Sequence, residues 1–219
     1  MIIREENIKL DNFSDDFALD VDNNKLYKNT LFFDLEHYVY KVPICIGVFG
    51  CCYYIEEGNS LKVTQYMIEN ENDANDILAL AKDYFINMYE QNNKRYIVTF
   101  SGNNDFSVIN YLFNKHEINY TILDHYSEID LQKYYENTMK KSIGLKNLEK
   151  EFNINRSSEL ISGQNLAKTF SKMVKDSTYI KRMPGSKVEK ILQYNKQDVV
   201  SLFYMVISNN VLMKGKEVK

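Results

Sequence analysis

Apolar residues cluster in runs of strand length along the first 130 positions of the chain. Leu31-Phe32-Phe33 leads into Asp34-Leu35-Glu36, and two further runs rich in β-forming residues flank the turn signal Glu57-Gly58-Asn59-Ser60. The pattern predicts strands at 30–36, 44–55, 61–68, 96–100 and 119–123. The second and third of these strands are expected to form a hairpin or meander.

Helical spacing of apolar residues appears between these strands and throughout the rest of the chain. The clearest helix covers 71 to about 91, with Asn72 or Asp73 able to cap its start. Further helices are predicted over 105–116, 131–137, 145–152, 164–175 and 187–209. Strands that alternate with helices predict an α/β sheet, and the last helix carries an apolar stripe that would dock on it.

A length of 219 residues with 44% hydrophobic composition is enough for one sizeable core. Only two prolines and eight glycines interrupt the chain, and no low-complexity stretch indicates a linker. We therefore expect one domain over 30–210, with residues 1–29 as an N-terminal extension packed on it and 211–219 as a flexible tail.

The net charge of -3 conceals an uneven distribution. Residues 1–130 hold 10 Lys+Arg against 22 Asp+Glu, a balance of -12, whereas residues 131–219 hold 17 against 8, a balance of +9. Two interpretations stay open. The basic half lines a phosphate backbone beside a carboxylate-bound metal site, or it is simply a solvated helical surface.

The cysteines, Cys45, Cys51 and Cys52, lie in one apolar run without a CxxC pair or nearby histidine, and we expect reduced, packed thiols. The N-terminus turns acidic before any apolar core builds up, which argues against a signal or transit peptide. The longest apolar stretch falls short of the roughly 20 residues that a membrane span needs. A cytoplasmic location and no membrane partner are therefore expected.

Four carboxylates are candidates for metal binding: Asp34, Glu36, Asp105 and Asp198. We expect the first strand to fray at its end, so that the chain turns both Asp34 and Glu36 toward one ion. Asp105 lies near the start of a helix that follows another strand, and Asp198 lies four residues after Tyr194 on the last helix. Hard divalent cations prefer such oxygen ligands. Each signal alone also fits a cap or a surface pair.

Taken in order, three segments resemble the motifs of DEDD-type 3′ to 5′ exonucleases of the tyrosine-bearing subgroup. They are Asp34-x-Glu36, the segment Phe100 to Asp105, and Tyr194-Asn195-Lys196-Gln197-Asp198. The connecting residues extend the similarity to YprB-like ribonuclease H-like proteins over roughly residues 30–210, notably at Ile44-Cys45-Ile46-Gly47, Gln65-Tyr66, Asp130-Leu131, Gly144 to Glu149, Asn153 to Arg156, Ile161-Ser162-Gly163 and Tyr194 to Leu202. This resemblance implies an RNase H-like mixed β-sheet of about five strands flanked by helices, with a helical C-terminal part.

The same resemblance implies a two-metal hydrolysis of phosphodiester bonds in DNA or RNA. One Mg²⁺ or Mn²⁺ would be held by Asp34, Glu36 and Asp198, and a second would be bridged by Asp34 and reached by Asp105. Tyr194 would orient the attacking water, and the product would be a nucleoside 5′-monophosphate. No small-molecule organic cofactor is expected.

Nucleic acid needs cationic contacts as well. Candidates for a phosphate track are Lys140, Lys141, Lys146, Arg156, Lys168, Lys172, Lys181, Arg182 and Lys187. Of these, Lys146, Arg156, Lys181 and Arg182 are predicted nucleic-acid-binding residues, together with His37, which follows the first motif closely enough to face a cleft. The other histidines, His116 and His125, are expected to be structural or exposed.

Three functions remain compatible with this sequence. The first is an active metal-dependent exonuclease. The second is a catalytically weak or inactive module that binds nucleic acid or a protein as a scaffold. The third is an endonuclease on the same fold, because a fold alone does not decide the reaction. Retention of all four carboxylates and the tyrosine favours the first.

Overall fold

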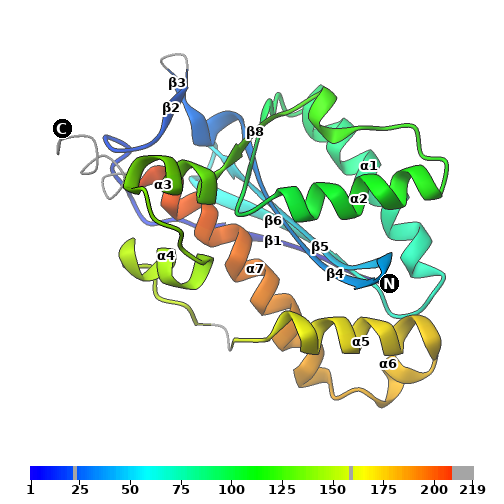
Figure 1. Cartoon of the computed structure of the whole chain (residues 1–219). Helices are drawn as coiled ribbons and strands as arrows, with labels where there is room; N and C mark the ends of the chain where they lie inside the picture. Colours follow the sequence, from blue (N-terminus) through cyan, green and yellow to red (C-terminus); the bar gives the residue numbers. More distant parts are fainter. Residues whose placement is uncertain (22–23, 158–159, 209–219) are drawn as a thin grey trace.

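A mixed sheet of six strands, in the order β1-β6-β5-β4-β7-β8, lies at the centre of the computed structural model, which describes residues 1–21, 24–157 and 160–208 (Figure 1). The strands are β1 (Ile2–Lys9), β4 (Thr30–Tyr40), β5 (Val42–Ile55), β6 (Ser60–Met67), β7 (Tyr96–Thr99) and β8 (Ser127–Asp130). A separate ribbon pairs β2 (Asp20–Val21) with β3 (Asn24–Lys25) and leads into the 3-10 turn η1 (Leu26–Asn29).

Strand direction changes at β4. From β1 to β4 the neighbours in the sheet are antiparallel, whereas β4, β7 and β8 run parallel to one another. The carboxyl ends of β4, β7 and β8 therefore meet on one side of the sheet, where residues that follow these strands come close together. The mixed sheet and its flanking helices confirm the predicted fold class.

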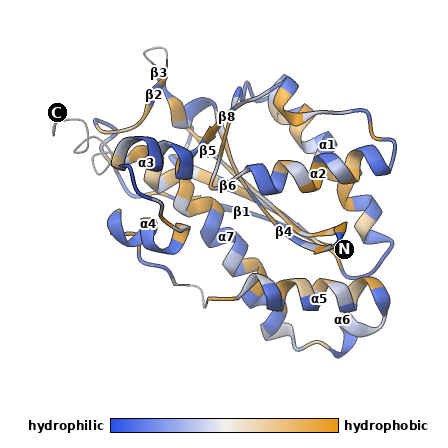
Figure 2. Cartoon of the chain, viewed as in Figure 1, coloured by the Kyte–Doolittle hydropathy of each residue, from blue (hydrophilic) through white to orange (hydrophobic). Residues whose placement is uncertain are grey.

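Helices cover both faces of the sheet (Figure 1). Phe33 on β4 packs against Phe85 and Phe106, whereas the adjacent Phe32 packs against Phe203 on the opposite face. The first face is covered by α1 (Asp73–Glu90) and α2 (Asn103–Lys115), and the second by α7 (Gly185–Ile207). Figure 2 shows mainly apolar residues on the strands between these layers and mainly polar residues on α4.

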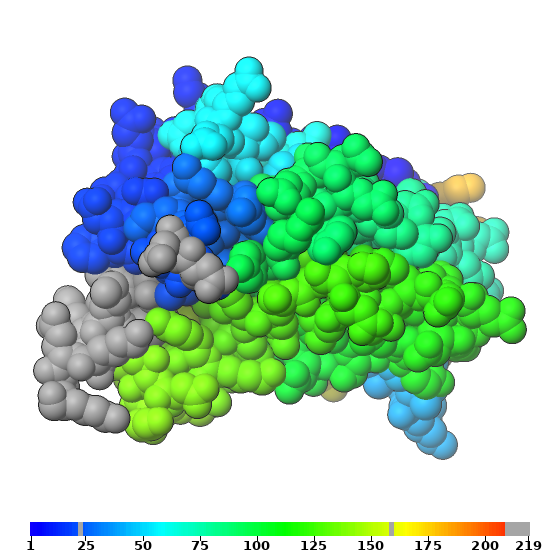
Figure 3. Space-filling model, turned by 90° about the horizontal axis from the view of Figure 1, so that it is seen from above, coloured from blue at the N-terminus to red at the C-terminus, as the bar shows by residue number. Residues whose placement is uncertain are grey.

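The remaining helices border the sheet. They are α3 (Leu131–Met139), α4 (Leu145–Glu151), α5 (Gly163–Lys175) and α6 (Tyr179–Arg182). The space-filling view from above shows the green residues, from about 100 to 150, packed beside the blue N-terminal segment (Figure 3). The helices predicted after residue 130 are confirmed, although α6 was not predicted. Asn209, the predicted end of the last helix, lies outside the described residues, as does the predicted tail. Helix α5 packs across β4 and β5, where the ring of Phe170 fills the space that a side chain at Gly47 would need.

The strand predicted at 119–123 is wrong. This segment contains a 3-10 turn, η2 (Ile122–Asp124), and the strand that pairs with β7 is β8, a few residues later. Ile122 is buried in the core and the Tyr120 ring stacks on His125, so the apolar residues serve packing rather than a ladder. Tertiary contacts have overridden local β-propensity here.

The start of α1 also differs from the prediction. Neither Asn72 nor Asp73 caps it through a side-chain hydrogen bond to the first turn. Instead Oδ1 of Asn70 accepts hydrogen bonds from the backbone N–H groups of Asn72 and Asp73. The Asp73 carboxylate accepts from the backbone N–H of Glu69 and so closes the preceding turn.

The N-terminal segment contributes a strand that the sequence analysis did not assign. Every second side chain of β1 is more exposed than its neighbours, as expected of an edge strand with one covered face, and β1 pairs along its whole length with β6. Tyr27 then contacts Phe13 and Phe203 in an aromatic cluster on the α7 face. The division of the chain at residue 29 stays a prediction.

All three cysteines are buried and form no disulfide, as predicted. Burial raises the pKa of the Cys45 thiol to about 12 and also raises the pKa of Cys51 and Cys52. None of the helices within the described ranges is both long and apolar enough to cross a membrane.

Candidate metal centre

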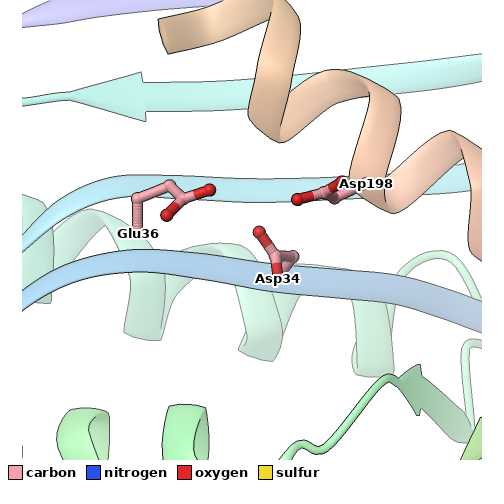
Figure 4. Close-up of side chains that lie close together, drawn as sticks. All are labelled: Asp34, Glu36 and Asp198. Carbon is pink, nitrogen blue, oxygen red and sulfur yellow. The ribbon is translucent and has the colours of Figure 1, made fainter. Parts of the chain in front are cut away.

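Three carboxylates from β4 and α7 converge on one point. Asp34 and Glu36 on β4 and Asp198 on α7 each offer an oxygen, and these oxygens lie within 4.8 Å of one another (Figure 4). Asp198 is buried, whereas Asp34 and Glu36 are half-buried and remain open on one side. The structure thus brings together the set that the resemblance assigns to one metal ion.

The strand does not fray at Glu36, so the expected reason for this convergence is wrong. β4 continues to Tyr40, and residues two apart on a strand point to the same face. Asp34 and Glu36 therefore both face α7, like Phe32 before them. The pairing with β5 shifts between Glu36 and His37, so the regular ladder is interrupted directly after the two carboxylates.

Asn195 fixes the Asp34 carboxylate and was not assigned a role from the sequence. Its Nδ2 donates to Oδ2 of Asp34 over 2.9 Å, while its Oδ1 accepts from Nε2 of Gln65 over 2.7 Å. Gln65 also donates to the carbonyl of Leu192, so its amide joins β6 to α7. Asn195 reaches the sheet only because Gly50 has no side chain, since a Cβ there would collide with the Asn195 amide.

Asp105 lies on the first turn of α2, at the carboxyl end of β7. β4 and β7 pair as far as Phe32 and Val98, so Asp34 stands just beyond the end of β7, where α2 begins. Asp105 is buried and is not among the three converging oxygens. Burial first, and then the charge of Asp34, raise its pKa, which places it within electrostatic range of the cluster.

Two cations contact Asp198. Nζ of Lys146 lies 3.0 Å from Oδ1 of Asp198, and the Arg156 guanidinium contacts the same oxygen. Arg156 is itself held by two hydrogen bonds to Glu149, at 2.5 and 2.9 Å. Glu149 is buried and also accepts from the hydroxyl of Ser201, so this network ties α4 to α7. Both cations contact Oδ1, and Asp198 has a second oxygen to offer.

Tyr194 stands one turn before Asp198 on α7. Nζ of Lys146 lies 4.2 Å from the centre of its ring, and the guanidinium carbon of Arg156 lies 5.4 Å from it. Burial, followed by the charges of Asp198 and Glu36, raises the pKa of Tyr194. Its hydroxyl is therefore protonated at neutral pH and can donate a hydrogen bond.

Carboxylates held this closely disfavour their own ionised forms. Burial and then the charge of Asp198 raise the pKa of Asp34 to about 7. Burial raises the pKa of Glu36 and Asp198 as well, although Lys146 and Arg156 oppose the shift at Asp198. A divalent cation would relieve this repulsion.

The donor set fits a hard divalent cation. Carboxylate oxygens are the ligands that Mg²⁺ prefers, and two oxygens bound to one Mg²⁺ lie at most about 4.2 Å apart. The observed limit of 4.8 Å needs only small side-chain rotations to reach that separation. Asp34, Glu36 and Asp198 can therefore hold one ion, with Asp105 beside them.

His37 lines a surface pocket of about 340 Å³ next to Glu36. The other walls come from Leu35 and Val39 on β4 and from Gln164 and Ala167 on α5. Nδ1 of His37 is buried without a hydrogen-bond partner within the described parts of the chain, and burial lowers the pKa of the ring. Its role in binding nucleic acid stays a prediction.

The predicted pair Lys181 and Arg182 lies on α6, apart from the carboxylates. Arg182 pairs with Asp176, and both side chains are exposed. Neither residue lines the pocket beside Glu36, and their role in binding nucleic acid stays a prediction.

Comparison with known proteins supports the fold. A family model described as the RNase H superfamily matches residues 31–209, which include Asp34, Glu36, Asp105 and Asp198. The chain belongs to the RNase H superfamily. Proteins of this superfamily act on nucleic acids, and its nucleases generally use divalent metals. A comparison with curated proteins gives no match.

Several residues that support the carboxylates were not singled out in the sequence analysis. Asn195, Gln65, Glu149 and Ser201 are buried polar residues around the site that received no role from the sequence. One available signal was polarity at buried helix positions: Asn195, which faces the sheet, and Ser201, which faces α4, lie among the apolar positions of α7. Buried polar side chains require partners, which points to a site.

Proposed function

We propose that this protein is a two-metal-dependent 3′ to 5′ exonuclease of the DEDD type, YprB-like in character, which releases nucleoside 5′-monophosphates from DNA or RNA. The observation that supports this most is the convergence of Asp34, Glu36 and Asp198 from β4 and α7, with Asp105 beside them. Structural proteins have little use for such a mutually repelling set, whereas metal catalysis requires it.

Divalent ions held by Asp34, Glu36, Asp105 and Asp198 would supply a nucleophilic water and stabilise charge on the leaving 3′ oxygen. Tyr194, kept protonated by its surroundings, would donate a hydrogen bond that orients the water. Asn195 would hold Asp34 in one rotamer, which keeps the ligand oxygens in place before substrate arrives.

Lys146 and Arg156 would have different roles. Arg156 is locked by Glu149 and stays on Asp198, so it limits the negative charge of the empty cluster. Lys146 is more exposed, at 31%, and has a flexible stem. It would turn from Asp198 to a phosphate oxygen when ions and substrate occupy the site.

The pocket beside Glu36 suits the terminal nucleoside. Leu35, Val39 and Ala167 give it apolar walls, and Gln164 and His37 offer polar groups near its rim. Sites for small ligands commonly combine apolar walls with a few placed polar groups. A base seated there would leave its phosphate next to the carboxylates.

The test is cleavage of end-labelled single-stranded and duplex DNA and RNA in the presence of Mn²⁺. Wild-type protein should shorten a substrate stepwise from the 3′ end, and Asp34→Asn should not. Asp124→Asn, an exposed aspartate outside the cluster, is the matched control and should cut like the wild type. Internal cuts would instead assign an endonuclease, and intact substrate with wild-type protein would reject the nuclease.

A second function has its own observation in its favour. Lys146 and Arg156 already neutralise Asp198, as metal would, which suits an inactive module that binds nucleic acid as a scaffold. Thermal melting separates the two. A nuclease site with Mn²⁺ at 100 times its Kd gains about 2.7 kcal/mol, or roughly 5–10 °C for a chain of this size. A scaffold that binds oligonucleotide but shows no Mn²⁺-dependent shift would replace the first proposal.

A further inference from the structure

A second pocket, of about 410 Å³, lies between α5, α6 and the start of α7. Helix α5 contributes Lys168 and Lys172, α7 contributes Lys187 and Lys190, and α6 contributes Tyr179. Leu160, which precedes α5, stands at the margin with 69% of its surface exposed. The metal site uses none of these residues.

The described lining of this pocket carries charge of one sign. Among the residues that the structure describes, four lysines line it and no carboxylate does. Within the described residues, Lys168, Lys172 and Lys187 form no ion pair. Lys168, Lys172 and Lys187 therefore give the pocket a positive charge, which attracts anions and raises their local concentration. The pocket is therefore built to receive negative charge.

The aromatic and apolar residues of the pocket indicate which class of anion it binds. Nζ of Lys172 lies 5.5 Å from the centre of the Tyr179 ring, so an aromatic surface adjoins the cations. Leu160 and Ile191 add apolar area. Alternation of cationic and aromatic or apolar surface is how proteins hold single-stranded nucleic acid, through phosphates and bases respectively.

The pocket is connected to the metal centre through α5. Gly163, Gln164 and Ala167 share the side of α5 that lines the pocket beside Glu36. Asn165, Lys168 and Lys172 lie on the adjoining side, which lines the basic pocket, and Lys168 follows Gln164 by one helical turn. The exposed first turn of α5 therefore separates the two pockets, within the roughly 20 Å length of this 13-residue helix.

We propose that the basic pocket binds the phosphodiester backbone of the substrate strand several nucleotides from the reacting bond. This inference rests on the proposed nuclease function and adds a second contact to it. The strand passes from the carboxylates over the start of α5 into the lysines. A substrate long enough to reach the pocket is held more tightly than one that fills only the metal site.

The experiment measures binding of a fluorescent 12-nucleotide single strand by anisotropy over a series of KCl concentrations. Asp34→Asn serves as the background, so that the strand stays intact. Into it we place Lys168→Gln/Lys172→Gln/Lys187→Gln, or the control Lys9→Gln/Lys82→Gln/Lys115→Gln on β1, α1 and α2. Each phosphate contact on a single strand contributes about 0.7 to the slope of log K against log salt, so the pocket variant should lose about 2. The control should lose nothing.

Charge-preserving Lys→Arg changes at the three pocket positions should keep the slope of log K against log salt at its value before the Lys→Gln changes. This result would show that the lost slope comes from the lost charge and not from a folding defect. An unchanged slope in the pocket variant overturns the inference, whether or not wild-type protein cuts. Displacement of the strand by a polyglutamate peptide of equal charge also overturns it, in favour of an acidic protein. If the strand binds through the pocket but wild-type protein with Mn²⁺ never shortens it, the pocket stands and the exonuclease is rejected.

Discussion

Asn195 on the last helix donates a hydrogen bond to the carboxylate of Asp34 on the central strand, over 2.9 Å. Its side chain is fully buried and its other end accepts from Gln65. A carboxylate of the cluster is thus oriented by an amide 161 positions away in the chain. The geometry of the candidate metal centre depends on how α7 packs on the sheet.

Removal of this amide should weaken the site without removing a ligand. Asn195→Ala leaves Asp34 free to rotate, and loss of such an orienting partner typically costs about 10–100-fold in metal affinity or activity. The Mn²⁺ concentration for half-maximal cleavage measures it. Asn110→Ala on α2, outside the cluster, should leave that concentration unchanged. An Asn195→Ala protein with wild-type Mn²⁺ dependence would contradict the assigned role.

Gly50→Ala should mimic this loss from the opposite side of the contact. An added Cβ collides with the Asn195 amide, and no flexible chain end is available to yield because Gln65 and Asp34 hold that amide. We expect both lower stability, by about 1–3 kcal/mol as in other overpacked cores, and weaker metal binding. Gly185→Ala, where an added Cβ meets nothing, is the control in urea denaturation and Mn²⁺ titration.

Arg156 should matter for folding as well as for the site. Its partner Glu149 is only 3% exposed, and a buried charge stripped of its partner costs about 3–5 kcal/mol. Arg156→Ala should therefore lower the urea midpoint strongly. Arg182→Ala breaks the exposed pair with Asp176 and should change stability by less than about 1 kcal/mol. Equal effects of the two changes would show that the Glu149 pair is not structurally important.

Stability of the metal-free protein should fall as pH rises from about 4 to 7. Burial and the neighbouring Asp198 raise the pKa of Asp34 to about 7, whereas an unfolded aspartate has a pKa of about 3.9. Between these values the folded state binds more protons than the unfolded state, so the free energy of unfolding decreases with pH. Urea midpoints in EDTA at pH 5, 6 and 7 test this. Asp34→Asn should flatten the decline, and a wild-type midpoint that climbs over this range would refute it.

The periodicity of apolar residues predicted most of the strands and helices, because the apolar face of each element depends only on residues within that element. The strand prediction failed at 119–123. Whether an apolar run becomes a strand also depends on a pairing partner, and β7 pairs with Ser127–Asp130 instead. The edge strand β1 was not predicted, because its alternation of charged and apolar residues could be assigned to a strand only once its pairing with β6 was known.

The candidate site shows the same difference between what a local pattern predicts and what depends on long-range contacts. Asp34, Glu36, Asp105 and Asp198 were predicted because their order along the chain resembles that of a known set of motifs, although β4 continues beyond Glu36 and Asp198 lies inside α7. Asn195 was not, because its role depends on Gly50, which is 145 positions away and lacks the side chain that would exclude it. Lys146 and Arg156 were predicted as contacts to nucleic acid, and the structure adds a contact to Asp198 that no spacing in the sequence encodes.

The burial of Cys45, Cys51 and Cys52 gives the experimenter an advantage. Since burial raises the pKa of each thiol and shields it from reagents, the native protein should react slowly with maleimides. A single cysteine introduced at an exposed position outside the basic pocket, such as Lys175 on α5, could then carry a fluorophore or spin label, with no need to replace the natural thiols. Strand passage along α5 would become directly observable.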